Sequence, residues 1–171
     1  VFLGRQALPT RDVAVKKARV SGGKLENLLL LEATIAGSLE HPNIVPIHEI
    51  RRSEDSEIEV VMKRIQGTTL RDLIGTSFQE KGYLEKALTV LIQATHALEF
   101  AHSQGVVHRD IKTQNIMIGD FGETYLLDWG IAIQMNNLSS FQDGLVGTPS
   151  GMAPEMLSGN LKDISKATDI F

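Results

Sequence analysis

Two short stretches decide the fold of this 171-residue chain: His108-Arg109-Asp110-Ile111-Lys112-Thr113-Gln114-Asn115 and Asp128-Trp129-Gly130. Together they supply two carboxylates, one lysine and one asparagine that could surround a metal-bound phosphate. An aspartate can accept a hydroxyl proton, and a lysine can neutralise charge on a phosphoryl group in transfer. An asparagine oxygen and a second aspartate suit Mg²⁺, a hard cation that prefers oxygen ligands. The set therefore predicts phosphoryl-transfer chemistry.

The composition is that of one ordinary domain without a strong charge bias. The chain has 17 basic and 21 acidic residues, a net charge of −4, and no lysine- or arginine-rich block that favours nucleic-acid binding. Apolar runs such as 28–31 are far shorter than the roughly 20 residues that cross a bilayer, so no membrane segment is expected here. Cysteine is absent, which excludes disulfides and is compatible with the cytoplasmic location that we expect.

The first part of the chain is predicted to be rich in strands. A helix is expected at 24–39, where apolar residues recur at helical spacing. It ends near His41-Pro42, because the residue before a proline disfavours the α conformation. Alternating or continuous apolar patterns predict strands at 1–4, 12–17, 44–50 and 58–62.

The pattern changes after residue 67. A long helix is predicted at 84–102, with Gly105 as its C-terminal cap. A hairpin is predicted from 115–118 and 124–128 around a turn at 119–123, and an irregular surface loop from 130 to 152. We therefore predict an α+β fold with two lobes: a small strand-rich lobe at 1–62, a hinge at 63–67 and a helical lobe at 68–171.

Lys16 and Glu32 are predicted to form a pair. Lys16 shares a strand face with Ala14, so a flat base could lie over Ala14 while the ammonium reaches phosphate oxygens. Glu32 interrupts an apolar helix stripe, and removing a carboxylate from water costs several kcal/mol unless a cation pairs with it. The alternatives are an exposed strand lysine and a glutamate at the edge of the stripe.

These motifs together resemble the protein-kinase family. Val13-Ala14-Val15-Lys16 is similar to its strand-three lysine motif, and Glu32 to its helix-C glutamate. Residues 108–115 resemble its catalytic loop. The end of its activation segment is matched by Gly147-Thr148-Pro149 and Ala153-Pro154-Glu155.

Finer features narrow the resemblance. Lys112 together with Thr148 is similar to the serine/threonine class rather than the tyrosine class. The stretch at 41–49 and the tryptophan at position 129 resemble bacterial eukaryotic-like serine/threonine kinases. The resemblance therefore implies ATP-dependent phosphorylation of protein substrates that bear serine or threonine.

A literal copy of the family's Asp-Phe-Gly metal motif occurs at Asp120-Phe121-Gly122. It lies only 5 residues after Asn115, which leaves no room for the two strands whose far end carries the metal ligand. Asp128 lies 13 residues after Asn115, follows an apolar run and precedes a polar loop. We therefore predict that 120–122 is a hairpin turn. The working motif is then Asp128-Trp129-Gly130, with its tryptophan packed beneath the helix at 24–39.

The resemblance also implies how ATP and Mg²⁺ bind. Lys16, held by Glu32, is expected to contact the inner phosphates, and Asn115 and Asp128 to bind Mg²⁺. The base pocket is expected to comprise Ala14, Met62, the backbone groups of Lys63 and Ile65, and Met117. The alternative for Met117 is that it is an ordinary core residue.

The catalytic roles follow from the same resemblance. Asp110 is expected to orient the substrate hydroxyl and accept its proton, and Lys112 to stabilise charge on the transferred phosphoryl group, with Asn115 beside them. Thr148 is expected to steady Asp110 and Lys112. His108 is predicted to be structural.

Arg109 carries a regulatory hypothesis. It could pair with a phosphate on Ser139 or Ser140 and thereby order the loop through charge-assisted hydrogen bonds. The alternative is that Arg109 orders the loop through carboxylates or backbone groups.

Both ends of the chain depart from the family pattern. The family's glycine-rich loop is expected before Val1, and Val1-Phe2-Leu3 resembles the strand after that loop. Nothing follows Phe171 in this sequence, and the arginine expected to pair with Glu155 is missing. We therefore expect a partial kinase domain, truncated at both ends. Lost burial is worth roughly 25 cal/mol per Å² against a net stability of about 5–15 kcal/mol, so the isolated segment is predicted to be poorly folded and inactive. Thr113, where the family usually has proline, should loosen the turn slightly.

Two other functions remain open. One is a catalytically inactive, kinase-like scaffold, although the intact set Lys16, Asp110, Asn115 and Asp128 argues against it. The other is a small-molecule phosphotransferase of related fold, although Lys112 and the segment at 147–155 favour a peptide substrate.

Overall fold

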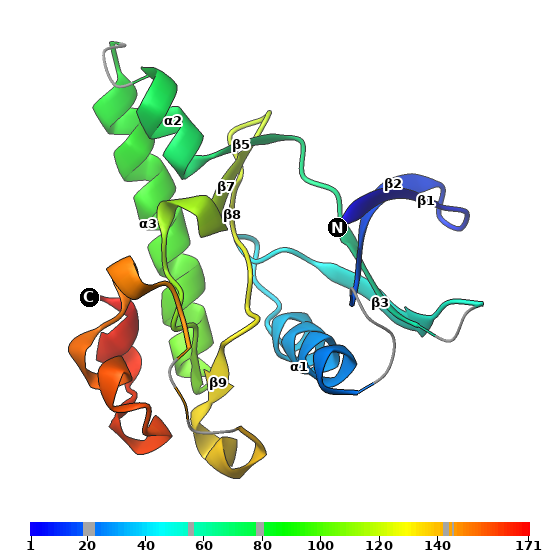
Figure 1. Cartoon of the computed structure of the whole chain (residues 1–171). Helices are drawn as coiled ribbons and strands as arrows, with labels where there is room; N and C mark the ends of the chain where they lie inside the picture. Colours follow the sequence, from blue (N-terminus) through cyan, green and yellow to red (C-terminus); the bar gives the residue numbers. More distant parts are fainter. Residues whose placement is uncertain (19–22, 55–56, 78–80, 142–143, 145) are drawn as a thin grey trace.

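In the computed structural model, strands β1 to β4 lie on one side of the molecule and the long helix α3 on the other (Figure 1). The structure describes residues 1–18, 23–54, 57–77, 81–141, 144 and 146–171. The predicted α+β fold class is confirmed by this mixture of helices and sheets. The elements of the first part are β1 (Phe2–Gln6), β2 (Arg11–Lys17), α1 (Lys24–Ser38), β3 (Ile47–Arg52) and β4 (Ile58–Lys63).

The remaining helices and strands build the second part of the molecule. They are β5 (Gly67–Thr69), α2 (Leu70–Ser77), α3 (Tyr83–Ser103), β6 (Val106–Val107), β7 (Ile116–Gly119), β8 (Thr124–Leu126) and β9 (Ile133–Gln134). Short 3₁₀ turns follow, the last of them at Lys166–Asp169 beside α3. Among the described residues, no helix combines the length and apolar character needed to span a bilayer.

The first sheet places the lysine strand against the helix that carries Glu32. Its strands run in the order β1-β2-β4-β3, all antiparallel, and pair Ala14 with Met62 and Lys16 with Val60. Because side chains alternate across a strand, Val13 and Val15 pack on the opposite face from these two β2 residues. Buried side chains of α1 and β4 join the sheet to the helix: Leu29, Ala33, Ile58 and Val60.

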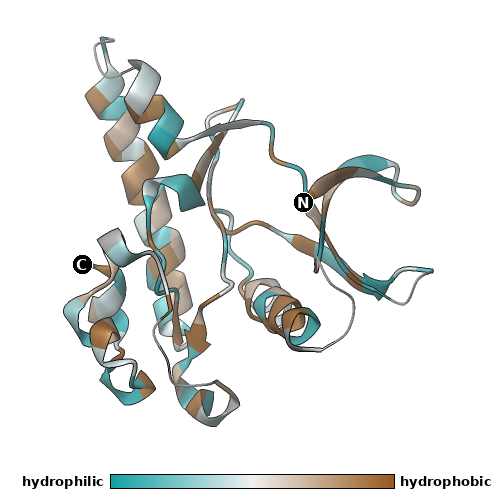
Figure 2. Cartoon of the chain, in the orientation of Figure 1, coloured by the Kyte–Doolittle hydropathy of each residue, from teal (hydrophilic) through white to brown (hydrophobic). Residues whose placement is uncertain are grey.

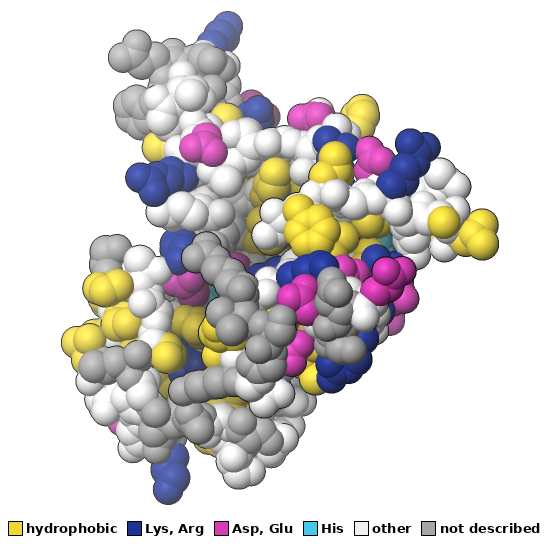
Figure 3. Space-filling model, turned by 45° about the vertical axis from the view of Figure 1, so that its right-hand side comes forward, with side chains coloured by type: hydrophobic (Ala, Val, Ile, Leu, Met, Phe, Trp, Pro, Cys, Tyr) yellow, Lys and Arg dark blue, Asp and Glu magenta, His cyan; other side chains and the backbone are white. Residues whose placement is uncertain are grey.

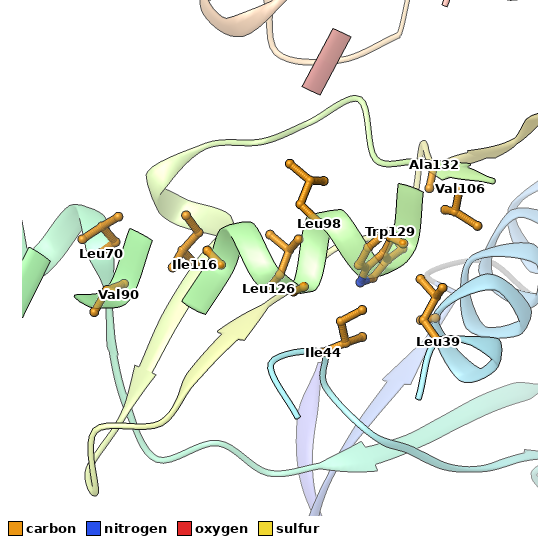
Figure 4. Close-up of a cluster of buried hydrophobic side chains, with 14 of the residues drawn as sticks. Leu39, Ile44, Leu70, Val90, Leu98, Val106, Ile116, Leu126, Trp129 and Ala132 are labelled. Atoms are coloured by element: carbon orange, nitrogen blue, oxygen red, sulfur yellow. The ribbon is translucent and has the colours of Figure 1, made fainter. Parts of the chain in front are cut away.

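The main core lies around α3. Ala97 and Ala101 are fully buried, so the small side chains of α3 let neighbouring segments approach closely. Figure 4 shows Trp129 between α3 and Leu39, with Ile44 and Leu126 beside it. Hydrophobic residues on both α1 and α3 contribute to this arrangement (Figure 2). The core therefore packs Trp129 against α1, as predicted, and also against α3, which was not predicted.

The hairpin prediction is confirmed. Strands β7 and β8 pair antiparallel in a sheet of order β5-β7-β8, and the literal Asp-Phe-Gly forms the turn between β7 and β8. Phe121 is 97% exposed, and Gly122 adopts a φ of 86°, which glycine accommodates without a Cβ clash. The copy at 120–122 therefore lies in an exposed turn.

Three local predictions were wrong or incomplete. Helix α2, which is short, was not predicted. It begins from a local cap in which Thr69 Oγ1 accepts the Asp72 N–H at 3.1 Å. The strand expected at 44–50 begins only at Ile47, since Ile44 instead bridges to Leu126 of β8. The loop expected from 130 contains β9, which pairs with β6.

The hairpin makes a stability prediction with a matched control. Leu126 is 1% exposed, so Leu126→Ala should lower the free energy of unfolding by about 2–5 kcal/mol through lost burial and a cavity. Phe121→Ala should change it by less than about 0.5 kcal/mol, because that ring is in water. Urea unfolding followed by circular dichroism measures both variants. Equal losses would contradict the assignment of residues 120–122 to an exposed turn.

Candidate functional site

The predicted nucleotide-binding residues line one cavity. Its volume is about 410 Å³, and it opens between the first sheet, α1 and the β7–β8 hairpin. On the face that contains the strand-rich part, hydrophobic side chains gather beside charged ones of both signs (Figure 3). The cavity lining includes Ala14, Lys16, Glu32, Met62, Lys63, Ile65, Asn115, Met117 and Asp128. Asp110 and Lys112 are not among the lining residues but are joined to them through Asn115.

The predicted pair of Lys16 and Glu32 is confirmed. The Lys16 Nζ atom lies 2.5 Å from Glu32 Oε1 and 3.9 Å from Asp128 Oδ1. The Lys16 side chain is 29% exposed and the Glu32 side chain 16%, so the pair is partly withdrawn from water. Helix α1 and strand β2 thus hold the Lys16 ammonium group close to the carboxylate of Asp128.

Gly130 makes room for the two carboxylates. A Cβ at this position would lie 3.2 Å from Asp128 Oδ1 and 3.3 Å from Glu32 Oε2. Such contacts are tighter than ordinary van der Waals packing, so a larger residue would press on both groups. The glycine after the tryptophan therefore allows both acidic side chains to approach Lys16.

The inner wall of the cavity was not predicted. It consists of apolar side chains from α1 and from the segment and strand that follow it: Leu29, Ala33, Ala36, Val45 and Ile47. The apolar stripe of the α1 helix was visible in the sequence. Which of its residues face a cavity rather than the core depends on the packing of α1 against β4 and Trp129, and no local pattern encodes that packing.

The Asp110 carboxylate accepts three hydrogen bonds. Lys112 Nζ donates to Oδ2 at 2.6 Å, Asn115 Nδ2 donates to Oδ2 at 3.1 Å, and Thr148 Oγ1 donates to Oδ1 at 2.8 Å. Lys112 Nζ also donates to Thr148 Oγ1 at 2.7 Å, which confirms that Thr148 steadies both residues. Burial alone raises the pKa of Asp110, but the contacts from Lys112, Thr148 and Asn115 outweigh it and hold the pKa below its ordinary value.

Asn115 connects this network to Asp128. The Asn115 Nδ2 group also donates to the Asp110 carbonyl at 2.9 Å, so its amide oxygen is left as an acceptor. The Asn115 carbonyl accepts the Leu127 N–H at 2.8 Å, which fixes the residue before Asp128 beside it. The Asn115 amide oxygen and the Asp128 carboxylate thus belong to neighbouring segments. Both are oxygen ligands of the kind that a hard cation prefers.

Asp169 holds the loop at 108–115 in place by hydrogen bonds, a role that was not predicted from the sequence. Its carboxylate accepts the His108 N–H at 2.8 Å and the Arg109 N–H at 2.6 Å, and lies 2.8 Å from His102 Nε2. The Asp169 side chain is completely buried. These contacts join residues about 60 positions apart in the sequence, so no spacing rule could have indicated them.

His108 is structural, as predicted. Its ring is fully buried, lies 4.6 Å from the Trp129 ring and has Nε2 3.0 Å from the Leu127 carbonyl. Its Nδ1 atom accepts the Asp110 N–H at 3.2 Å. Burial lowers the pKa of His108 despite the nearby carboxylate of Asp169. The neutral ring therefore links the Asp110 N–H to the Leu127 carbonyl.

Arg109 is held by the backbone of the neighbouring segment. Its Nε atom donates to the Ile131 carbonyl at 2.6 Å, and burial lowers the pKa of the guanidinium to about 10. Ser139 Oγ bonds to Asn137 Oδ1 at 3.2 Å, and the side chain of Ser140 lies outside the described part of the structure. Pairing of Arg109 with a phosphorylated serine therefore stays a prediction.

Comparison with known proteins agrees with this geometry. A family model described as "Protein kinase domain" matches residues 1–171. The chain is 33% identical over 200 aligned residues to the serine/threonine-protein kinase PknD of Chlamydia pneumoniae, covering 100% of this chain and 21% of that protein. The PknD proteins of Protochlamydia amoebophila and Chlamydia trachomatis serovar D are each 34% identical, again over the whole chain and over 20% and 22% of their lengths.

The chain thus spans about a fifth of the length of these curated relatives. The match nevertheless extends from the first residue to the last, and takes in both the β2 lysine and the loop at 108–115. By this full-length match, the chain belongs to the protein kinase family.

Proposed function

We propose that the protein containing this chain transfers the γ-phosphoryl group of ATP to serine or threonine hydroxyls of other proteins. The observation that carries the proposal is the convergence of Lys16, Glu32, Asn115 and Asp128 on one cavity, with Asp110 next to it. The printed names of the similar bacterial proteins, all serine/threonine-protein kinases, support the same activity.

The cavity fits a magnesium nucleotide by its donor chemistry. Its apolar wall around Ala14, Met62 and Met117 suits a flat base, and the backbone groups of Lys63 and Ile65 can pair with the edge of that base. Lys16, held by Glu32, would contact the inner phosphates. Mg²⁺ would take the oxygens of Asn115 and Asp128, two hard protein ligands, and complete its shell from phosphates and water.

The neighbouring residues can perform the transfer. Mg²⁺ and ATP, when bound, supply the phosphoryl group with part of its charge neutralised. Asp110 would orient the acceptor hydroxyl and take its proton, because its lowered pKa keeps it a carboxylate at neutral pH. Lys112, which already contacts both Asp110 and Thr148, would stabilise charge on the phosphoryl oxygens.

Our proposal includes two lobes joined by a hinge. Residues 1–62 form the small lobe, 63–67 the hinge and 68–171 part of the helical lobe. The segment at 147–155, tied to Asp110 through Thr148, would offer an extended peptide its platform. We also propose a cytoplasmic location for this catalytic part, with which the cysteine-free sequence is compatible.

The acceptor class is tested by direct comparison of substrates. The full-length protein with Mg²⁺ and ATP should phosphorylate serine- or threonine-containing peptides, and should leave sugars and aminoglycosides unmodified. Transfer to small molecules alone would replace the proposal with a small-molecule phosphotransferase.

Asp110→Asn should separate catalysis from binding. The variant keeps the size of the side chain but cannot accept a proton, so kcat should fall by at least about a hundredfold. Its affinity for Mg²⁺–ATP should remain within about threefold of the wild type, since Asp110 does not line the cavity. Radiolabelled phosphate transfer and calorimetric ATP binding measure the two quantities. Absence of transfer by the wild type as well would favour the scaffold alternative.

A matched pair of aspartates tests the choice of metal motif. Asp128→Asn should weaken Mg²⁺-dependent ATP binding and lower kcat by about a hundredfold or more, because one anionic ligand is lost. Asp120→Asn should change neither, because Asp120 lies in the exposed turn. Titration of activity with Mg²⁺ in both variants reads out the difference. Loss of activity in Asp120→Asn alone would mean that the literal Asp-Phe-Gly is the metal site.

A further inference from the structure

Glu155, at the end of the proposed peptide platform, has a hydroxyl as its partner. Thr168 Oγ1 donates to Glu155 Oε1 at 2.6 Å, across 13 positions of the chain. Within the described residues, no lysine or arginine forms an ion pair with Glu155. The Thr168 hydroxyl is therefore a direct hydrogen-bond partner of this carboxylate.

Thr168 is itself held firmly. Its side chain is part of a capping box in which Oγ1 accepts the Ser165 N–H at 3.1 Å, and the residue is 5% exposed. The same hydroxyl thus acts both as an acceptor, from the Ser165 N–H, and as a donor, to Glu155. The residue that follows is Asp169, whose buried carboxylate holds the N–H groups of His108 and Arg109. Thr168 and the anchor of the catalytic loop are thus consecutive residues.

The platform is tied to the catalytic loop at its other end as well. Thr148 donates to Asp110 at 2.8 Å and accepts from Lys112. Directly after the second tie, Met156 packs in a cluster with Val107 and other apolar residues. The segment from 148 to 155 is therefore joined to the loop twice, by Thr148 directly and by Glu155 through Thr168 and Asp169. The hydrogen bond between Thr168 and Glu155 completes the second of these two connections.

We propose that Thr168 is a positioning residue for the protein substrate. Its hydroxyl sets the place of Glu155, and hence of the platform, relative to Asp110. The proposal rests on the kinase activity inferred above and adds one consequence to it. Loss of the hydroxyl should loosen the peptide platform while leaving the nucleotide cavity intact, because no residue from 148 to 171 lines that cavity.

Thr168→Val is the direct test, made in the full-length protein. Valine preserves the shape of the side chain and removes the donor. Ser165 is an exposed residue, so water can take the place of the acceptor that its N–H loses. The KM for a peptide substrate should rise about tenfold, in line with the worth of a hydrogen bond to a charged group. The KM for ATP should change by less than about twofold. Thr168→Ser, which retains the hydroxyl, should restore the peptide KM.

Thr89→Val is the matched control. Thr89 also donates its hydroxyl, to the Glu85 carbonyl at 2.9 Å, but on the exposed surface of α3. The KM values of Thr89→Val for the peptide and for ATP should equal those of the wild type. An unchanged peptide KM in Thr168→Val, a parallel rise of both KM values, or failure of serine to rescue would each overturn the proposal. If Thr168→Val does not fold, Thr168→Ala, judged against Thr168→Ser, decides in the same way, because it also removes the hydroxyl that donates to Glu155.

Hydrogen exchange separates this proposal from the proposed activity. Amides of residues 148–158 should exchange faster in Thr168→Val than in the wild type, Thr168→Ser or Thr89→Val, whether or not any peptide is phosphorylated. Absence of that difference would overturn the positioning role even in an active kinase. An inactive wild type that shows the difference would instead count against the kinase activity alone.

Discussion

The buried carboxylate of Asp169 is the constraint on which the site depends. Arg109 has a φ of 67°, in the left-handed region that residues with a Cβ seldom adopt. Such backbone strain costs about 1–3 kcal/mol and persists only where the surroundings fix it. Asp169 supplies this by accepting the N–H groups of both His108 and Arg109. The loop then presents Asp110 to the three donors that surround its carboxylate.

A second constraint joins the two parts of the molecule through charge. Lys16 on β2 pairs with Glu32 on α1 and lies 3.9 Å from Asp128 on the segment after β8. Three separate elements thus meet at one ammonium group. A displacement of α1 would leave Glu32 partly buried without its cation, which is costly. Helix α1 and the segment that carries Asp128 are therefore linked through Lys16.

The sequence was most informative where chemistry is local. The loop at 108–115 and the strand face of Lys16 and Ala14 were predicted from residue types, spacing and the resemblance to protein kinases, and every residue predicted to bind the nucleotide lines one cavity. The choice of Asp128 over the literal Asp-Phe-Gly copy rests on the hairpin, which the structure confirms, and the metal-binding role of Asp128 stays a prediction. The anchoring role of Asp169 could not be predicted, because it contacts backbone groups about 60 residues away. The Thr168 contact with Glu155 was missed for the same reason: its partners meet only after folding.

We infer that side chains distant in the sequence converge on one magnesium nucleotide. A crystal structure of the full-length protein with Mg²⁺ and a non-hydrolysable ATP analogue is the decisive experiment. We expect Mg²⁺ at about 2.0–2.1 Å from an oxygen of Asn115 and from a carboxylate oxygen of Asp128. We also expect Lys16 to contact the phosphates. A nucleotide bound outside this cavity, or a metal held by neither residue, would contradict it.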